Sequence, residues 1–182
     1  MLTTASRPTR NAPYAAHRRL RAGLLAAWVL AAGAWFAAAQ TDLLHKPAPA
    51  FVRTDLSGRR IDLHAYRGKV VLLNFWATWC GPCQVELPRF SAWQKQYGPA
   101  GLQVIAASMD DDSTGVRPVV RKLKLDFPVV MGDEKLGMLY GGVLGLPVTF
   151  LIGRDGKVAA RIDSGADLDA TERRIQQLLA QH

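Results

Sequence analysis

The chain has 182 residues, of which 49% are hydrophobic and 21% charged, a composition that excludes a disordered or fibrous protein and favours one globular domain with a short extension. Its formal net charge of +8 is unevenly spread, because residues 1–40 contain five arginines and no acidic residue. The rest of the chain is only mildly basic and has no basic stripe with interleaved aromatic residues, so we expect no nucleic-acid partner.

The N-terminal segment has the pattern of a membrane anchor. Residues 1–21 are polar and basic, and an uncharged run of 18 residues begins at Ala22. This run approaches the length of about 20 residues that spans a bilayer, and the arginines before it favour a cytoplasmic N-terminus. We therefore expect a cytoplasmic tail over 1–21, a transmembrane anchor over 22–40 and a folded domain over 41–182. The alternative is a signal peptide cleaved after Ala39, which also places the domain outside the cytoplasm.

The first elements of the domain are extended. Two short strands are predicted over Phe51–Leu56 and Arg60–Leu63, on either side of a turn at Ser57 and Gly58. Lys69–Phe75 is a nearly continuous apolar run, which is typical of a strand buried on both faces of a sheet.

Helices and strands then alternate. A helix reaches to about Tyr97, and we expect Pro88 to kink it. Leu102–Ser108 is the next buried strand, and apolar residues at helical spacing predict an amphipathic helix over 116–123. The run of three aspartates at 110–112 between them is interpreted as a solvated loop.

The last third of the chain predicts a short helix over Lys135–Tyr140 and a hairpin that joins Thr149–Ile152 to Lys157–Arg161. A final helix is expected to begin near Asp169, with Glu172 completing a capping box. This order of elements predicts an α/β fold, with a central mixed sheet and helices on both faces.

The chemistry is expected at the two cysteines of the chain, Cys80 and Cys83. Two cysteines are too few for a disulfide framework and supply only half of a zinc site. They follow a buried strand and open a helix, where free backbone N–H groups and the helix dipole favour negative charge. Disulfide exchange needs an attacking thiolate and a second thiol that resolves the mixed disulfide. We therefore predict that Cys80 attacks, that Cys83 resolves, and that no metal or cofactor is needed beyond this redox-active pair.

The neighbours of the pair have supporting roles in this interpretation. Gly81 and Pro82 form the first helical turn, where the missing N–H of proline costs nothing. Trp79 shields one side of the pair and offers an apolar contact to a substrate.

The segment Val70–Cys83, with the sequence VVLLNFWATWCGPC, resembles the active-site stretch of the thioredoxin superfamily. It is most similar to the membrane-tethered periplasmic branch of the TlpA/ResA type, and the similarity extends from about Lys46 to the C-terminus. This resemblance implies a thioredoxin-like three-layer fold and a thiol-disulfide oxidoreductase. It also implies a single-pass protein of the inner membrane with its catalytic domain in the periplasm.

The resemblance implies further site residues. The family has a cis-proline that faces the cysteines, and Pro147 matches it, so we expect Pro147 and Leu146 to contact substrate. Glu86 stands where the ResA-like branch has a glutamate that assists proton transfer, a general acid/base role, with a solvated carboxylate as the alternative. Asn74 replaces the buried aspartate of cytoplasmic thioredoxins, so we expect it to be a buried, hydrogen-bonded support rather than a proton relay.

The Gly-Pro dipeptide between the cysteines matches thioredoxin itself, which is a reductant. The resemblance thus implies a monomer that reduces protein disulfides, for example in cytochrome c maturation or in assembly of the copper site of an oxidase. A membrane thiol transporter would supply its electrons.

Two alternatives remain open. One is a peroxiredoxin-like peroxidase. Such enzymes have a threonine three residues before the reactive cysteine, whereas Thr78 lies two residues before Cys80, which argues against this alternative. The other is a chaperone that holds Cu(I) between the two thiolates.

Overall fold

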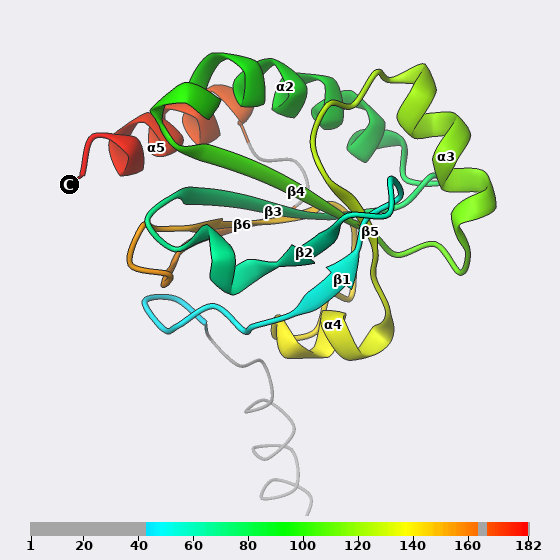
Figure 1. Cartoon of the computed structure of the whole chain (residues 1–182), viewed down its shortest axis with the longest axis horizontal. Coiled ribbons are helices and arrows are strands. Elements are labelled where there is room, and N and C mark those ends of the chain that lie inside the picture. The colour runs from blue at the N-terminus through cyan, green and yellow to red at the C-terminus, as the bar shows by residue number, and fades with distance from the viewer. Residues whose placement is uncertain (1–42, 164–166, 182) are drawn as a thin grey trace, which may run out of the picture. The chain divides into compact units, whose positions relative to one another are not determined.

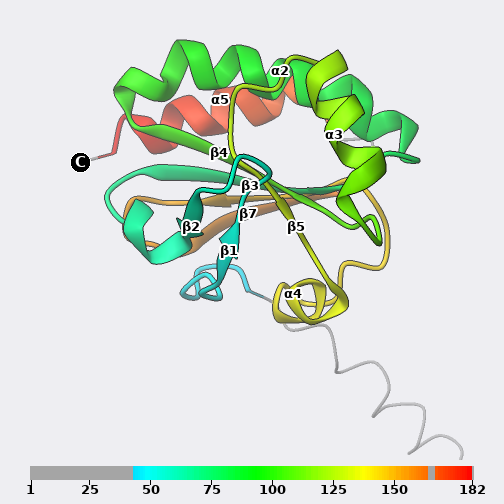
Figure 2. The same ribbon diagram turned by 45° about the vertical axis from the view of Figure 1, so that its right-hand side comes forward.

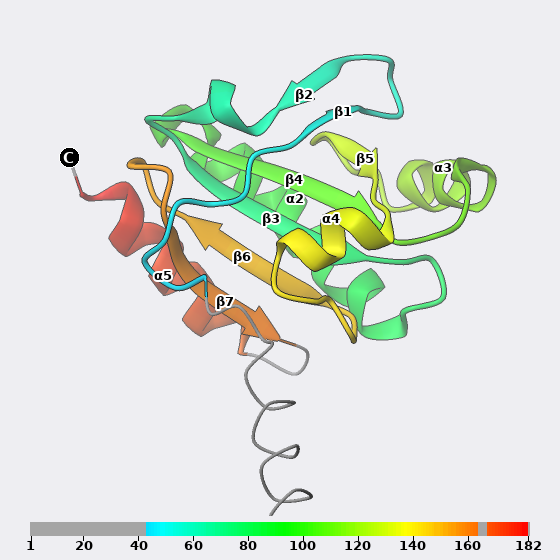
Figure 3. The same cartoon turned by 90° about the horizontal axis from the view of Figure 1, so that it is seen from below.

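The centre of the domain is a five-stranded sheet with the strand order β5-β4-β3-β6-β7 (Figure 3). β3 is parallel to β4 and β4 to β5, whereas β6 is antiparallel to both β3 and β7. The mixed sheet predicted from the sequence is therefore confirmed. In chain order the strands are β3 (Val70–Trp76), β4 (Leu102–Ser108), β5 (Val129–Met131), β6 (Val148–Ile152) and β7 (Val158–Asp163).

The computed structural model describes residues 43–163 and 167–181, so the predicted cytoplasmic tail and membrane segment lie outside the described residues. The described residues belong to one compact unit, Thr41–His182. Among them, no helix has both the length and the apolar character needed to cross a bilayer.

β3 is central because both of its faces are covered, and all seven of its residues are buried. Val70, Leu72 and Trp76 point to one hydrophobic core, whereas Val71, Leu73 and Phe75 point to a second core on the other face. This alternation explains the continuous apolar run in the sequence, because neither face of the strand meets water.

Helices cover both faces of the sheet (Figures 1 and 2). The first core is covered by α2 (Gly81–Tyr97), α3 (Ser113–Lys122) and α5 (Leu168–Leu179). The second core is covered by α4 (Glu134–Leu139) and by the ribbon of β1 (Val52–Thr54) and β2 (Arg60–Asp62). Two short 3₁₀ helices, η1 (Leu63–Tyr66) and η2 (Gly98–Ala100), lead into β3 and β4.

The C-terminal helix begins earlier than the sequence predicted. Asp167 caps it by accepting from the N–H of Asp169, and the helix starts at Leu168. Glu172, which was expected to complete a capping box, instead accepts from the hydroxyl of Tyr97 at 2.7 Å and from Arg89 at 3.1 Å. The predicted capping box is therefore wrong, because with Asp167 as N-cap the residue three positions on is Ala170 and not Glu172.

The chain joins the domain at the end of the sheet where the β6–β7 turn lies. Leu44 forms an isolated bridge with Val158, and Pro47 forms one with Lys157. Both contacts lie at the start of β7, beside the last residue of β6.

Candidate active site

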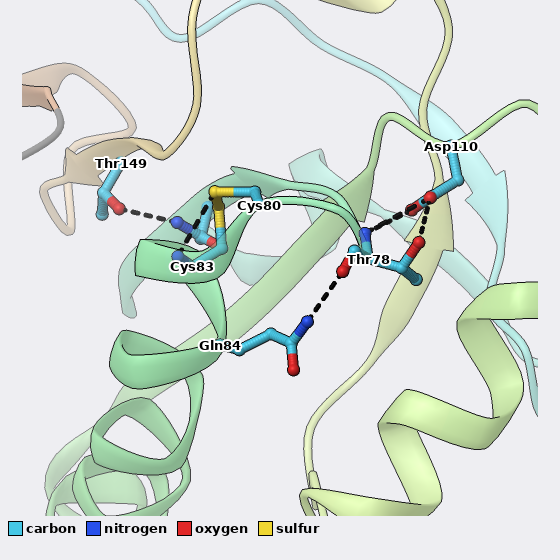
Figure 4. Close-up of a disulfide and its surroundings, with 7 residues drawn as sticks. Thr78, Cys80, Cys83, Gln84, Asp110 and Thr149 are labelled. Carbon is cyan, nitrogen blue, oxygen red and sulfur yellow. Dashed lines mark hydrogen bonds between the residues drawn. A yellow bond between two sulfur atoms is a disulfide. The ribbon is translucent and has the colours of Figure 1, made fainter.

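Cys80 and Cys83 lie at the junction between the central strand β3 and the helix α2, as the sequence predicted. β3 ends at Trp76, and Cys80 is the N-cap of α2. The two cysteines form a disulfide (Figure 4). Cys80 is 5% exposed and Cys83 is 1% exposed. The pair is therefore held at the edge of the first core, with Cys80 as the more exposed residue.

The helix N-terminus provides a stabilising partner for negative charge on Cys80. The backbone N–H of Cys83 donates to Sγ of Cys80 at 3.3 Å. This donor is one of the N–H groups that have no partner within the first turn of a helix. Together with the helix dipole, it favours the thiolate form of Cys80 once the disulfide is reduced.

Trp79 is 72% exposed although the cysteine that follows it is buried. An exposed indole beside a reactive sulfur is available for apolar contact with a second protein. Gly81 and Pro82 form the exposed first turn of α2. A Cβ atom added at Gly81 would meet no atom within 4 Å, so packing does not require glycine there.

The bond between Leu146 and Pro147 is cis, as the family resemblance implied. Pro147 directly precedes β6, in which Val148 pairs with Phe75 near the end of β3. This register places Pro147 and the cysteines at the same end of the sheet. Leu146 is half-buried and packs against both hydrophobic cores.

Glu86 and Pro147 meet at one small cavity of about 10 Å³, which Phe90 and Thr149 also line. Glu86 is half-buried, and this burial raises the pKa of its carboxyl above the ordinary value, because a charge is poorly solvated there. Its environment differs from that of the freely solvated carboxylate weighed as the alternative.

Asn74 is buried in β3 and is hydrogen-bonded, as expected. Its Nδ2 donates to Oγ1 of Thr149 on β6 at 2.9 Å. Its Oδ1 is buried and has no hydrogen-bond partner among the described residues. An amide cannot carry a proton as a carboxylate does, so this residue serves to join β3 to β6 below the site.

Sequence reasoning missed Asp110, because three consecutive aspartates were interpreted as a solvated loop. Asp111 and Asp112 are exposed, and Asp112 caps α3, but the carboxylate of Asp110 binds Thr78 (Figure 4). The one signal in the sequence was its position two residues after the apolar run of β4. The carboxyl ends of adjacent parallel strands meet at one edge of a sheet, and β3 leads to Cys80 at that edge.

Within residues 43–163 and 167–181, no group of three or more His, Cys, Asp and Glu side chains is arranged to hold a metal ion. The arrangement that these residues do provide is a buried cysteine pair at a helix N-terminus, with a cis-proline loop and a half-buried glutamate at the same end of the sheet. Such a pair can exchange disulfides.

Known proteins are similar to this chain in sequence and in fold. A model of the AhpC/TSA family matches residues 44–161. The thiol-disulfide oxidoreductase ResA of Bacillus thuringiensis subsp. konkukian is 41% identical over 117 residues, which cover 64% of this chain and 68% of that protein. ResA of Bacillus subtilis is 34% identical over 144 residues, which cover 76% and 80%.

Solved structures agree with these sequence matches. A Chlorobium tepidum protein assigned as a thiol:disulfide interchange protein DsbE superposes with a TM-score of 0.69 at 33% identity. The superposition covers 74% of this chain and 96% of that one. A second thiol:disulfide interchange protein of the thioredoxin family, from Chlorobium tepidum TLS, gives a TM-score of 0.70 at 26% identity and covers 77% and 100%.

Proposed function

The chain belongs to the thioredoxin-like AhpC/TSA family and is a thiol-disulfide oxidoreductase, and we propose that it reduces protein disulfides through Cys80 and Cys83. The observation that carries this proposal is the position of Cys80 as N-cap of α2, with its sulfur accepting from the N–H of Cys83. This arrangement stabilises a thiolate at the more accessible cysteine and keeps a second thiol within bonding distance.

The reaction follows from the roles of the two sulfurs. The Cys80 thiolate attacks one sulfur of a client disulfide, and the other client sulfur leaves as a thiolate that takes up a proton. Cys83 then loses its proton and attacks Sγ of Cys80. The Cys80–Cys83 disulfide forms, and the second client thiolate is released. Two electrons pass to the client, and the protein is left in the oxidised form that the structure shows.

Glu86 is the proposed proton acceptor for Cys83. It lies one helical turn after Cys83 on α2, so the two side chains share a face of the helix. A carboxyl whose pKa is raised by burial is closer in basicity to a thiol at neutral pH than an exposed carboxylate is. Pro147 and Leu146, at the same end of the sheet, would contact the client chain together with Trp79.

The proposed location is the periplasmic side of the inner membrane, with residues 22–40 as an uncleaved anchor. Support comes from the uncharged run that starts at Ala22, the arginines before it and the resemblance to tethered relatives. A reductant there needs electrons from a membrane thiol transporter. Its clients would be cysteine pairs of apocytochromes c or of copper-binding oxidase subunits. No observation on the described residues favours a peroxidase or a Cu(I) chaperone.

Insulin reduction by the 41–182 unit, driven by a low-potential dithiol, tests the proposed activity. Cys80→Ser should abolish turnover, because the attacking sulfur is lost. Cys83→Ser is the matched control, since it also removes one cysteine but keeps Cys80. It should still attack once and then accumulate as a mixed disulfide with insulin. Full turnover by the Cys80→Ser protein would refute the assignment.

The location is tested with the full chain in its host. Membranes washed at high pH should retain the protein at its full length, because a spanning helix resists extraction. Release of a shorter protein that begins near residue 40 would show cleavage of a signal peptide and would exclude the anchor.

A further inference from the structure

The segment that leads to Cys80 is held by a residue that follows the neighbouring strand β4. β3 and β4 pair in parallel up to Trp76 and Ser108, and the N–H of Met109 donates to the carbonyl of Trp76 at 2.7 Å. Two residues beyond the paired ends lie Thr78 on one side and Asp110 on the other. Here the backbone N–H of Thr78 donates to the Asp110 carboxylate rather than to a backbone carbonyl.

Both oxygens of the Asp110 carboxylate are engaged. The backbone N–H of Thr78 donates to Oδ1 at 3.2 Å and to Oδ2 at 3.0 Å. The hydroxyl of Thr78 donates to Oδ1 at 2.6 Å, and the hydroxyl of Ser108 donates to Oδ2 at 2.6 Å. Hydrogen bonds to an ionised acceptor are shorter and stronger than those between neutral groups. Asp110 thus fixes the position of Thr78 from the side of β4.

A second side chain holds Thr78 from the side of α2. Nε2 of Gln84 donates to the carbonyl of Thr78 at 2.7 Å (Figure 4). All three polar groups of Thr78, its N–H, its hydroxyl and its carbonyl, therefore have side-chain partners. The next two residues are the exposed Trp79 and the N-cap Cys80, so a shift of Thr78 would be transmitted directly to the reactive sulfur.

We propose that Asp110 is a positioning residue for the disulfide exchange: by binding Thr78 it keeps the Trp79–Cys80 backbone in the conformation that seats Cys80 as the N-cap of α2. The inference rests on the proposed role of Cys80 as the attacking thiolate. Asp110 itself needs no contact with the client. Its effect is on how well Sγ of Cys80 is placed against the N–H groups that stabilise the thiolate.

The test uses substitutions that keep the net charge constant, so that a change in position is separated from a change in charge. Asp110→Glu moves the carboxylate by one methylene, and Thr78→Val removes the hydroxyl donor while keeping the side-chain shape. Both are made singly and together in a Cys83→Ser background, which leaves Cys80 as the one thiol. Asp111→Glu is the matched control, because Asp111 is an exposed neighbour of the same type.

Two quantities are measured on the reduced 41–182 unit, in which all side chains of both hydrophobic cores lie. They are the pH titration of the Cys80 thiolate by ultraviolet absorbance and the rate of its reaction with a chromogenic aryl disulfide. Each substitution should move the titration midpoint upward and slow the reaction at neutral pH by about three- to tenfold, the effect expected for loss of one hydrogen bond. The double variant should be no slower than the slower single variant, because the hydroxyl bond that Thr78→Val removes is one of those that Asp110→Glu already disturbs.

The proposal is overturned if Asp110→Glu and Thr78→Val keep the midpoint and rate of the control, even if they lower the thermal stability. It is equally overturned if the two effects add, because the residues would then act independently. These readouts need no client protein. A failure of the proposed reductase function would show in the insulin assay, whereas a failure of the positioning role would show in the titration and in the reaction with the aryl disulfide. The two failures are therefore distinguishable.

Discussion

At the scale of single residues, the environment of Glu86 makes a prediction about pH. Burial penalises its charged form and raises the pKa above the ordinary value of 4.5. Below the raised pKa the carboxyl is protonated and cannot accept the proton of Cys83, and above it the carboxylate can. The release of client from the mixed disulfide should therefore speed up as the pH rises through the pKa of Glu86.

Glu86→Gln should remove this rise and slow client release at neutral pH, by roughly 100-fold if Glu86 is the general base. Rapid-quench analysis of the mixed disulfide across the acid range measures the rate of client release. Glu134→Gln is the control, because Glu134 is an exposed glutamate. A raised pKa in the folded state also means that ionisation of Glu86 costs stability as the pH rises. The Glu86→Gln protein should therefore resist denaturant better than wild type at neutral pH, and this gain should vanish in acid. An unchanged pH profile of release would rule out the proton-transfer role.

The sequence separates two kinds of site residue. Cys80 and Cys83 were predictable because their spacing and their place before a helix have a chemical meaning by themselves. Asp110 was not, because its role depends on the register between β3 and β4, which no local pattern encodes. An aspartate after a strand looks the same in the sequence whether it binds water or a backbone N–H 32 residues away.

At the scale of elements, the buried strands were predicted well and the helix starts less well. β3 and β4 are apolar on both faces, so their sequence pattern is strong. α3 starts three residues before its first apolar position, because Asp112 caps it. α5 is likewise capped by Asp167, ahead of the predicted start. In α3 the residues before Val116 are polar or glycine and largely exposed, and hydrophobic periodicity gives no signal there.

The helix α2 contains a proline, a residue type that disfavours the interior of a helix. Pro88 lies inside it, yet the helix continues from Gly81 to Tyr97. Leu87, Phe90 and Trp93 are buried on either side of the proline and pack into the first core. Tertiary packing of this face maintains the helix where a proline removes one backbone hydrogen bond.

At the scale of the whole molecule, the direction of electron flow is linked to folding stability. A strong oxidant of this superfamily stabilises its reduced form. A reductant must instead stabilise its oxidised form, so that folding favours the disulfide over the dithiol. If Cys80 and Cys83 serve as a reductant, the oxidised 41–182 unit should unfold at a higher denaturant concentration than the reduced unit.

Equilibrium unfolding with and without a strong dithiol reductant measures this difference. A variant with both cysteines replaced by serine is the control, since its unfolding should not respond to the dithiol. Greater stability of the reduced protein would identify an oxidant and would contradict the proposed direction, while leaving the disulfide exchange itself intact.

The chain joins the domain at Leu44 and Pro47, beside the start of β7, whereas Cys80 follows the far end of β3. Because β6 runs antiparallel to β3, these are opposite ends of the sheet, separated by about 20 Å along a seven-residue strand. If residues 22–40 are the proposed anchor, the described domain is connected to it at the end of the sheet opposite to the two sulfurs.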